Sequence, residues 1–137
     1  MQLNITTDYA VRCLMYLTHT NRTTSAAEIG EYMCVSKNFV VGIMKKLREA
    51  GLVEAVRGTA GGFYLAKPAA EITLYDVVFT MENTLAVSRC LEDGVCNRNA
   101  TGSCNVRKFY GVLQNSMNDM LKSINLASVS ENLEESF

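Results

Sequence analysis

Three of the five cysteines stand close together in the second half of the chain, at Cys90, Cys96 and Cys104. Five residues separate the first two, and seven separate the second from the third. The segment between them is rich in glycine, asparagine and aspartate and has little apolar periodicity, a composition typical of a solvent-accessible loop. Thiols clustered in such a loop are candidates for metal ligands or redox groups.

The spacing of the thiols bears on their chemistry. Structural zinc sites usually bring two cysteines within about two to four residues of each other, so the wider gaps here disfavour a structural zinc. Iron-sulfur clusters accept thiolates with more varied separations. Loop disulfides, or no role at all, remain the alternative, although an odd total of five cysteines leaves one thiol unpaired.

Length and composition limit the possible classes of protein. A chain of 137 residues with 48% hydrophobic residues suits one domain, or one small domain plus an appended helix. The start has no basic stretch followed by an apolar run, and no segment approaches the ~18 uninterrupted apolar residues that would span a bilayer. We therefore expect a soluble cytoplasmic protein with no membrane partner, and reducing conditions there favour free thiols over disulfides.

An enzyme is not expected. The chain has one histidine, His19, no nucleophile motif and no phosphate-binding glycine loop, so it lacks a catalytic constellation. The glycines of GTAGG are followed by a predicted strand instead of a helix amino terminus, which makes them a poor phosphate cradle.

The net charge of -1 hides an asymmetry between the halves of the chain. Residues 1–67 contain eight Lys/Arg and five Asp/Glu, whereas residues 68–137 contain five and nine. A basic first half and an acidic second half suggest that only the first contacts a polyanion.

The first half predicts a winged helix-turn-helix. Apolar residues at helical spacing predict a helix over residues 6–19. Ser25, with Glu28 at capping-box spacing, predicts the start of a second helix, and Ser36 caps a third helix that Gly51 ends. Two strands are predicted over residues 52–57 and 63–66, joined by GTAGG, whose glycines suit positive φ in a hairpin. Solvated charge and a plain structural turn are the alternatives for the basic helix face and the hairpin.

The second half predicts a linker helix, a loop and a dimerisation helix. Thr73 and Asp76 have capping-box spacing and predict the start of a helix that leads into the cysteine loop. After Cys104, apolar residues recur in an almost strict heptad, typical of a helix that pairs with a copy of itself. They are Val106, Tyr110, Leu113, Met117, Met120 and Ile124. We therefore predict a homodimer, and a frayed tail over residues 128–137.

The predicted fold is mostly helical with a small β-hairpin wing. Residues 1–70 form a winged helix-turn-helix DNA-binding domain, and residues 71–137 contain the linker helix, the cysteine loop (residues 90–104) and the dimerisation helix.

With these features in order, the sequence resembles the Rrf-two family of winged-helix transcription repressors, and within it the IscR and NsrR regulators. The resemblance covers nearly the whole chain. It rests on the cysteine loop and on two further segments, MQLNITTDYAVRCLMYL and VSKNFVVGIMKKLREAGLVEAVRGTAGGFYLAKPAAEITLYDVV. It implies a homodimer that binds an iron-sulfur cluster, 2Fe-2S or 4Fe-4S. The affinity for double-stranded promoter DNA then changes with cluster state, in response to nitric oxide, iron-sulfur or iron status, or oxidants.

The resemblance also assigns DNA-contacting residues. SKNFVVG matches the family's base-reading helix, and Arg57 matches its wing arginine. The basic face of the third predicted helix adds two lysines beyond that motif. Together the candidate DNA contacts are Ser36, Lys37, Asn38, Phe39, Lys45, Lys46 and Arg57.

For the cluster, Cys90, Cys96 and Cys104 match the family's ligands. IscR-like members have a histidine ligand shortly after the third cysteine, but residues 105–107 here are Asn, Val and Arg. The gap before Cys104 is also longer than in IscR or NsrR. Asp8 matches the aspartate that serves NsrR-type members as fourth ligand, so the resemblance favours NsrR-like sensing. An aspartate in a first helical turn is also favoured by the helix dipole alone.

Three hypotheses follow. The first is a cluster-sensing DNA-binding repressor. The second is a DNA-binding dimer whose loop thiols bind zinc or form a redox disulfide. The third is a winged helix used for protein contacts only, which would show no salt-dependent DNA binding.

Overall fold

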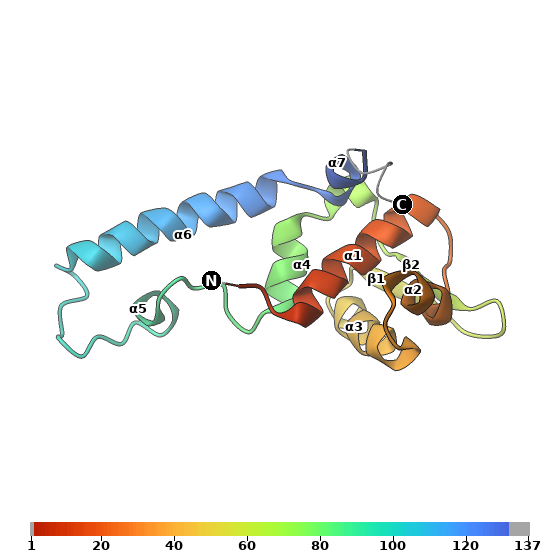
Figure 1. Ribbon diagram of the computed structural model, residues 1–137. Coiled ribbons are helices and arrows are strands. Elements are labelled where there is room, and N and C mark those ends of the chain that lie inside the picture. The colour runs from red at the N-terminus through yellow and green to blue at the C-terminus, as the bar shows by residue number, and fades with distance from the viewer. Residues whose placement is uncertain (1, 132–137) are drawn as a thin grey trace.

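The computed structural model describes residues 2–131 and consists of a winged-helix body from which one long helix projects (Figure 1). Nearly all regular structure is helical, apart from one antiparallel hairpin. In chain order the elements are α1 (Ile5–Thr20), α2 (Ala26–Met33), α3 (Lys37–Glu49), β1 (Val53–Val56), β2 (Gly62–Leu65), the 3-10 turn η1 (Ala69–Glu71), α4 (Leu74–Met81), α5 (Arg89–Glu92), α6 (Asn105–Ser123) and α7 (Leu126–Glu131).

Helix α1 is the central element of the body and contacts α2, α3, α4, α7 and β2. Ala10, Leu14 and Leu17, spaced at three to four residues, are buried on one face, as the apolar pattern predicts. The predicted helix over residues 6–19 is confirmed, with Asn4 as its N-cap: the Asn4 side chain accepts a hydrogen bond from the backbone N–H of Thr6 at 3.0 Å.

Local capping defines the helix-turn-helix. The hydroxyls of Ser25 and Ser36 accept hydrogen bonds from the backbone N–H groups three residues later, each at 3.1 Å, so both predicted caps are confirmed. Glu28 was expected to complete a capping box with Ser25, but its side chain has other partners. Its carboxylate accepts hydrogen bonds from the Arg22 guanidinium at 2.6 Å and from the Tyr16 hydroxyl at 3.1 Å, and these bonds occupy the group that a full capping box would use.

The hairpin packs directly against the body. β1 pairs with β2 from Val53 opposite Leu65 to Val56 opposite Gly62, which confirms the predicted wing. Of the loop glycines only Gly58 has a positive φ, at 108°. Gly62 lets β2 lie close to the backbone at Thr24, since a Cβ at position 62 would be only 2.3 Å from the Thr24 carbonyl oxygen.

The chain returns to the body after α6. The backbone N–H of Leu74 donates to the Ile124 carbonyl, and that of Leu126 donates to the Ile72 carbonyl, each at 2.9 Å. Leu126 is fully buried and α7 packs on α1. The predicted frayed tail is therefore wrong for residues 128–131, which are helical because α7 has a docking face on the core. Residues 132–137 lie outside the described part of the chain.

The predicted capping box of Thr73 and Asp76 is present at the start of α4. Beyond α4 the chain forms an extended arm: it passes through α5 to the far end, and α6 runs from that end back to the body (Figure 1). α6 has no buried residue. It ends at Ser123, so the predicted heptad residue Ile124 lies outside the helix and is held instead by its backbone bond to α4.

Candidate nucleic-acid interface and cysteine loop

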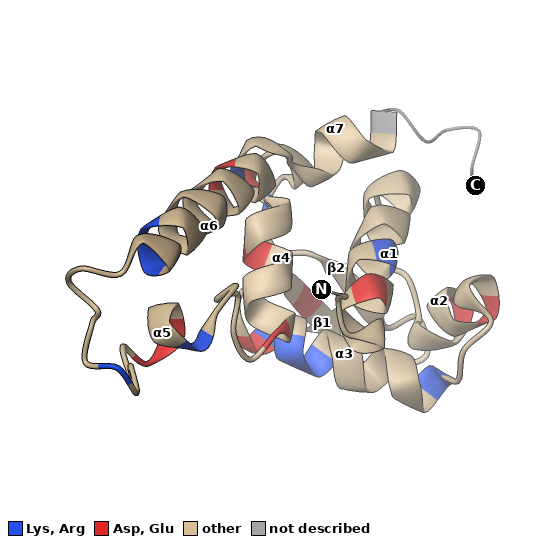
Figure 2. Ribbon diagram, turned by 60° about the vertical axis from the view of Figure 1, so that its left-hand side comes forward, with Lys and Arg blue, Asp and Glu red and all other residues tan. Residues whose placement is uncertain are grey.

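Helix α3 is amphipathic in the way a groove-binding helix requires. Four of its apolar side chains are buried in the body, and they are Val40, Ile43, Met44 and Leu47. The opposite face is exposed and basic, and Figure 2 shows Lys and Arg along this helix. Four predicted contacts lie on it: Lys37, Asn38, Lys45 and Lys46. Their side chains are free to meet a polyanion.

Two predicted DNA contacts have side chains engaged in the fold. The Ser36 hydroxyl accepts the Phe39 N–H as the N-cap of α3. Phe39 is half-buried, and its ring meets the Tyr9 ring edge-on, with centroids 5.5 Å apart. Ser36 therefore caps the start of α3, and Phe39 packs that end of the helix on α1.

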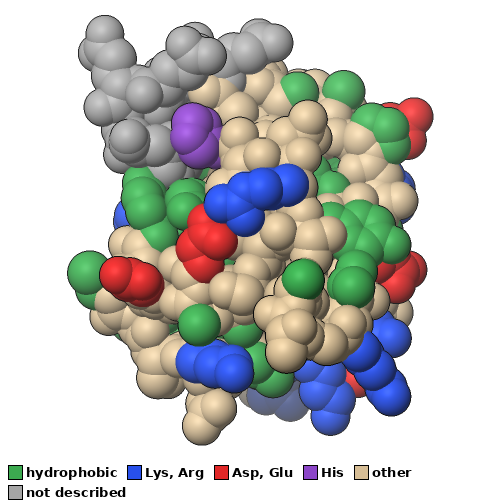
Figure 3. All heavy atoms as spheres, turned by 90° about the vertical axis from the view of Figure 1, so that its right-hand side faces the viewer, with side chains coloured by type: hydrophobic (Ala, Val, Ile, Leu, Met, Phe, Trp, Pro, Cys, Tyr) green, Lys and Arg blue, Asp and Glu red, His purple; other side chains and the backbone are tan. Residues whose placement is uncertain are grey.

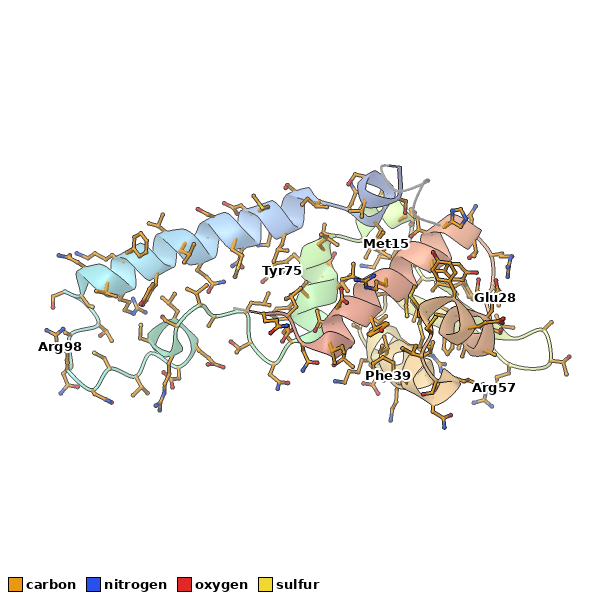
Figure 4. All side chains as sticks on the ribbon, in the orientation of Figure 1. Met15, Glu28, Phe39, Arg57, Tyr75 and Arg98 are labelled. Atoms are coloured by element: carbon orange, nitrogen blue, oxygen red, sulfur yellow. The ribbon has the colours of Figure 1, made fainter. Side chains whose placement is uncertain are left out.

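The wing extends the basic surface beyond α3. Arg57 follows β1 directly and is exposed, on the side of the molecule where the hairpin loop projects (Figure 4). Viewed from that side, Lys and Arg side chains gather along the lower edge of the molecule (Figure 3). A groove of about 560 Å³ lies between helix and hairpin, lined by Val41, Lys45, Arg48, Glu49, Ala55 and Phe63. Ala55 and Phe63 come from the hairpin and reach this groove only because the hairpin packs on α3, so local sequence patterns did not identify them.

The three loop cysteines occupy distinct local settings. Cys90 lies in the short helix α5, and its sulfur is 3.2 Å from the Ser88 hydroxyl. Cys104 is the N-cap of α6, with its sulfur accepting the Arg107 backbone N–H at 3.5 Å. The Arg107 side chain also donates to the Cys90 carbonyl at 3.4 Å. Arg107 thus ties the two ends of the loop together.

The loop backbone surrounds the sulfur of Cys96 with hydrogen-bond donors. Hydrogen bonds from the backbone N–H groups of Ala100 and Arg98 lower the pKa of its thiol, and the Arg98 charge adds to this effect. Asn99 adopts the left-handed conformation, with φ of 51°, and its backbone N–H donates to the Cys96 carbonyl at 3.0 Å. The loop backbone therefore stabilises the thiolate, the form that binds metal or reacts with oxidants.

The other two cysteines are not part of this group. Cys13 is buried in α1, and burial raises the pKa of its thiol to about 12, so it stays protonated. Cys34 is exposed in the turn between α2 and α3.

The candidate ligands are not gathered in one chain. Within residues 2–131, no group of three His, Cys, Asp or Glu side chains is placed to hold a metal ion. Asp8 lies in the first turn of α1, where its carboxylate pairs with Arg12 at 3.0 Å. Figure 4 places Arg98, in the cysteine loop, at the end of the molecule opposite Arg57. Three cysteine thiols suit a metal group held by thiolates. To bind one such group together, the three sulfurs would have to move closer to each other or be joined by a ligand from a second copy of the chain.

Comparison with known proteins identifies the family. Residues 3–132 match the sequence profile of Rrf2, described as an iron-dependent transcriptional regulator. Protein aau3 of Rhizobium meliloti (strain 1021) is 39% identical over 133 residues, covering 90% of this chain and 86% of that protein. This chain belongs to the Rrf2 family.

Solved structures share the fold of this Rrf2 protein. CymR (YrzC), the global cysteine regulator of B. subtilis, superimposes with a TM-score of 0.78 at 21% identity over 96% of this chain and 98% of its own. T. potens IscR superimposes with a TM-score of 0.78 at 22% identity, covering 99% of this chain and 90% of its own. The oxidized form of Staphylococcus aureus CymR superimposes with a TM-score of 0.74 at 21% identity, covering 96% of this chain and 97% of its own. The predicted mostly helical winged helix with a hairpin wing is thereby confirmed.

Membership places the chain among transcriptional regulators that bind DNA. Helices in the described range, residues 2–131, are too short or too polar to cross a membrane.

Proposed function

We propose that this Rrf2 protein is a dimeric repressor whose affinity for promoter DNA is set by an iron-sulfur cluster at Cys90, Cys96 and Cys104. The cluster senses nitric oxide, iron or iron-sulfur status, or redox state. One observation carries the proposal: three partly exposed thiols share one loop at the tip of an arm, away from the basic surface. Residues 1–70 bind DNA in this proposal, and residues 71–137 provide the sensor loop and the dimer contact.

The DNA contact rests on the exposed basic face of α3 and on the wing. Lys37, Lys45 and Lys46 are exposed on one helix, and Arg57 lies on the adjacent hairpin. Cations so placed neutralise backbone phosphates and release counterions, which gives salt-dependent affinity. Asn38 offers an amide that matches the hydrogen-bonding edge of adenine in the major groove.

The dimer contact rests on the outer face of α6. Five large apolar side chains on this helix are between 42% and 66% exposed, namely Val106, Phe109, Val112, Leu113 and Met120. We call this set the α6 stripe. Two residues of the predicted heptad, Tyr110 and Met117, are half-buried instead, and Met117 lines a cavity with Leu121 and Val87 of its own chain. Covering the α6 stripe with a second copy removes this apolar surface from water.

The ligand set has three thiols and needs a fourth donor. Arg107 stands where a neutral donor would be expected and cannot coordinate a metal. We assign the fourth position to Asp8 of the second copy, whose carboxylate is half-exposed and held only by an ion pair within its own helix. Cys90, Cys96 and Cys104 with this Asp8 would hold the cluster, which would supply a redox-active iron centre able to react with the signal.

A second function is favoured by the Cys96 thiol. Its lowered pKa gives a thiolate that reacts with oxidants or binds zinc without iron. The loop would then act as a zinc site or a thiol-disulfide switch on the same dimer.

Spectroscopy of anaerobically purified protein tests the choice. The absorption and Mössbauer spectra should show a 2Fe-2S or 4Fe-4S cluster, and Cys96→Ala should remove it. A colourless wild-type protein that gains no iron on anaerobic reconstitution, yet binds DNA, would replace the first function by the second.

Asp8→Asn tests the fourth ligand. The change keeps the size of the side chain and removes the anionic donor, so the cluster spectrum should shift or the cluster should be lost faster, with little change in stability of the apo-protein. A reconstituted spectrum identical to wild type would end this assignment.

A further inference from the structure

Gly42 stands at the centre of the outward face of α3. At helical spacing it follows Asn38 by one turn and precedes Lys45 by about one turn, so the three lie on one face. Val40, Ile43 and Met44, its neighbours in sequence, point the other way into the core. The middle of the basic face therefore has no side chain at all.

The fold gives no reason for glycine at this position. A Cβ built on Gly42 meets nothing within 4 Å, and the residue has ordinary helical φ. Glycine is among the poorest helix formers, so alanine would stabilise α3. Other glycines of the body contrast with it, because a Cβ at Gly30 would lie 2.8 Å from the Val35 carbonyl and one at Gly62 would lie 2.3 Å from that of Thr24.

Beside this gap an apolar side chain faces solvent. Val41 is 42% exposed and lines the groove between α3 and the hairpin, next to Lys45 and Arg48. The groove thus combines the apolar side chains of Val41, Ala55 and Phe63 with the charged side chains of Lys45, Arg48 and Glu49. An exposed branched apolar side chain such as Val41 gains nothing from contact with water. It is well placed for an apolar group on a polyanion, and in duplex DNA the thymine 5-methyl in the major groove is such a group.

We propose that Gly42 and Val41 determine operator specificity. Gly42 lets the backbone of α3 lie directly against a base pair in the major groove, and Val41 packs on the 5-methyl of a thymine there. Asn38 and Lys45, above and below the gap, then reach base edges and phosphates. An added Cβ at position 42 would hold the helix away by about one carbon-carbon bond, ~1.5 Å, enough to break hydrogen bonds to bases. The inference rests on the proposed DNA-binding function.

Gly42→Ala should separate folding from binding. The probes are a duplex selected by the wild-type protein from a random pool and a scrambled duplex of the same composition. The variant should unfold at higher temperature than wild type and bind the selected duplex about tenfold more weakly, with unchanged affinity for the scrambled one. Gly111→Ala is the matched control, since Gly111 lies within α6, outside the α6 stripe, and its added Cβ also meets nothing within 4 Å. It should gain stability and keep wild-type DNA affinity.

A thymine-to-uracil exchange tests Val41. Replacing thymines of the selected duplex one at a time by uracil removes only the methyl group, and one replacement should weaken wild-type binding severalfold. Val41→Ala should bind the thymine and uracil duplexes equally.

The outcomes distinguish this inference from the function on which it rests. If wild type prefers the selected duplex and Gly42→Ala binds it equally well, the inference is wrong and the DNA-binding function stands. The same holds for Val41 if no uracil replacement affects wild type. If wild type binds no duplex in a salt-dependent way, the proposed function and the inference both fail.

Discussion

The Glu82 carboxylate accepts hydrogen bonds from the Thr7 hydroxyl at 2.7 Å and from the Asn4 backbone N–H at 2.8 Å. Thr7 is fully buried in the first turn of α1, and Glu82 is the C-cap of α4, where the chain leaves the body for the cysteine loop. This pair therefore fastens the base of the arm to the helix that supports the helix-turn-helix. A movement of the arm that displaces Glu82 would therefore also disturb the first turn of α1.

Thr7→Val should lower the free energy of unfolding by about 1 kcal/mol, because it keeps the shape of the side chain and removes one donor to a carboxylate. Chemical denaturation at neutral pH measures this loss. Thr6→Val, at a neighbouring half-buried position whose hydroxyl bonds only Asn4, is the control and should cost less. Equal losses would mean that the bond to Glu82 contributes nothing specific.

The same contact should appear in the pH dependence of stability. Hydrogen bonds from Thr7 and Asn4 lower the pKa of Glu82 below its ordinary value of 4.5. The unfolded chain then takes up a proton at higher pH than the folded one, so this stabilisation is present above pH 4.5 and is lost as the pH falls through the folded pKa. Unfolding of Glu82→Gln should depend less steeply on pH in the acid range. If Glu82→Gln and wild type lose stability equally steeply as the pH falls below 4.5, Glu82 does not contribute in this way.

Gly30→Ala should destabilise the helix-turn-helix by about 1 to 3 kcal/mol. The added Cβ would lie 2.8 Å from the Val35 carbonyl oxygen, which is backbone and can move only if the turn between α2 and α3 opens. Thermal unfolding measures the effect, and Gly111→Ala serves as comparison because its Cβ meets open space and should stabilise by up to about 1 kcal/mol. A Gly30→Ala protein as stable as wild type would show that the turn is not tightly packed.

Leu113→Asp should convert the dimer to monomer. Leu113 lies in the α6 stripe and is 42% exposed in the single chain, so the variant can fold alone, but pairing would bury a carboxylate at a cost of several kcal/mol. Asn115→Asp on the same helix adds the same charge outside the stripe and should remain dimeric. Sedimentation velocity decides, and a Leu113→Asp dimer as tight as wild type would rule out this face.

Arg57→Ala should weaken DNA binding at every sequence and reduce the slope of log K against log salt by about one, because a wing arginine contacts phosphate. Lys108→Ala removes an exposed charge on α6 and should leave the slope unchanged. Fluorescence anisotropy over a salt series gives both slopes. An unaltered slope for Arg57→Ala would remove the wing from the interface.

Local chemistry explains what could be predicted from the sequence. The caps at Ser25, Ser36 and Thr73 need only a hydroxyl and the next helical turn, so their positions were predictable. The wing followed from two short apolar runs around glycines. The family resemblance came from the same segments.

What could not be predicted depends on contacts between distant residues. The docking of α7 requires backbone bonds between residues 72–74 and 124–126, about fifty positions apart in the sequence. Met117 is half-buried because residues 84–87, before α5, line a cavity with it on that side of α6, and no heptad pattern contains this information. The amides that lower the pKa of Cys96 likewise come from the conformation of residues 98–100.

The central claim is that the state of the cysteine loop sets DNA affinity across the length of the molecule. The most direct measurement compares affinity for a duplex selected from a random pool by the cluster-loaded protein, before and after anaerobic removal of the cluster with nitric oxide, with Cys96→Ala alongside. We predict a change of at least about tenfold for wild type, the scale of ordinary allosteric coupling. Cys96→Ala should show one affinity under both conditions. Equal affinities of cluster-loaded and cluster-free wild type would contradict the account.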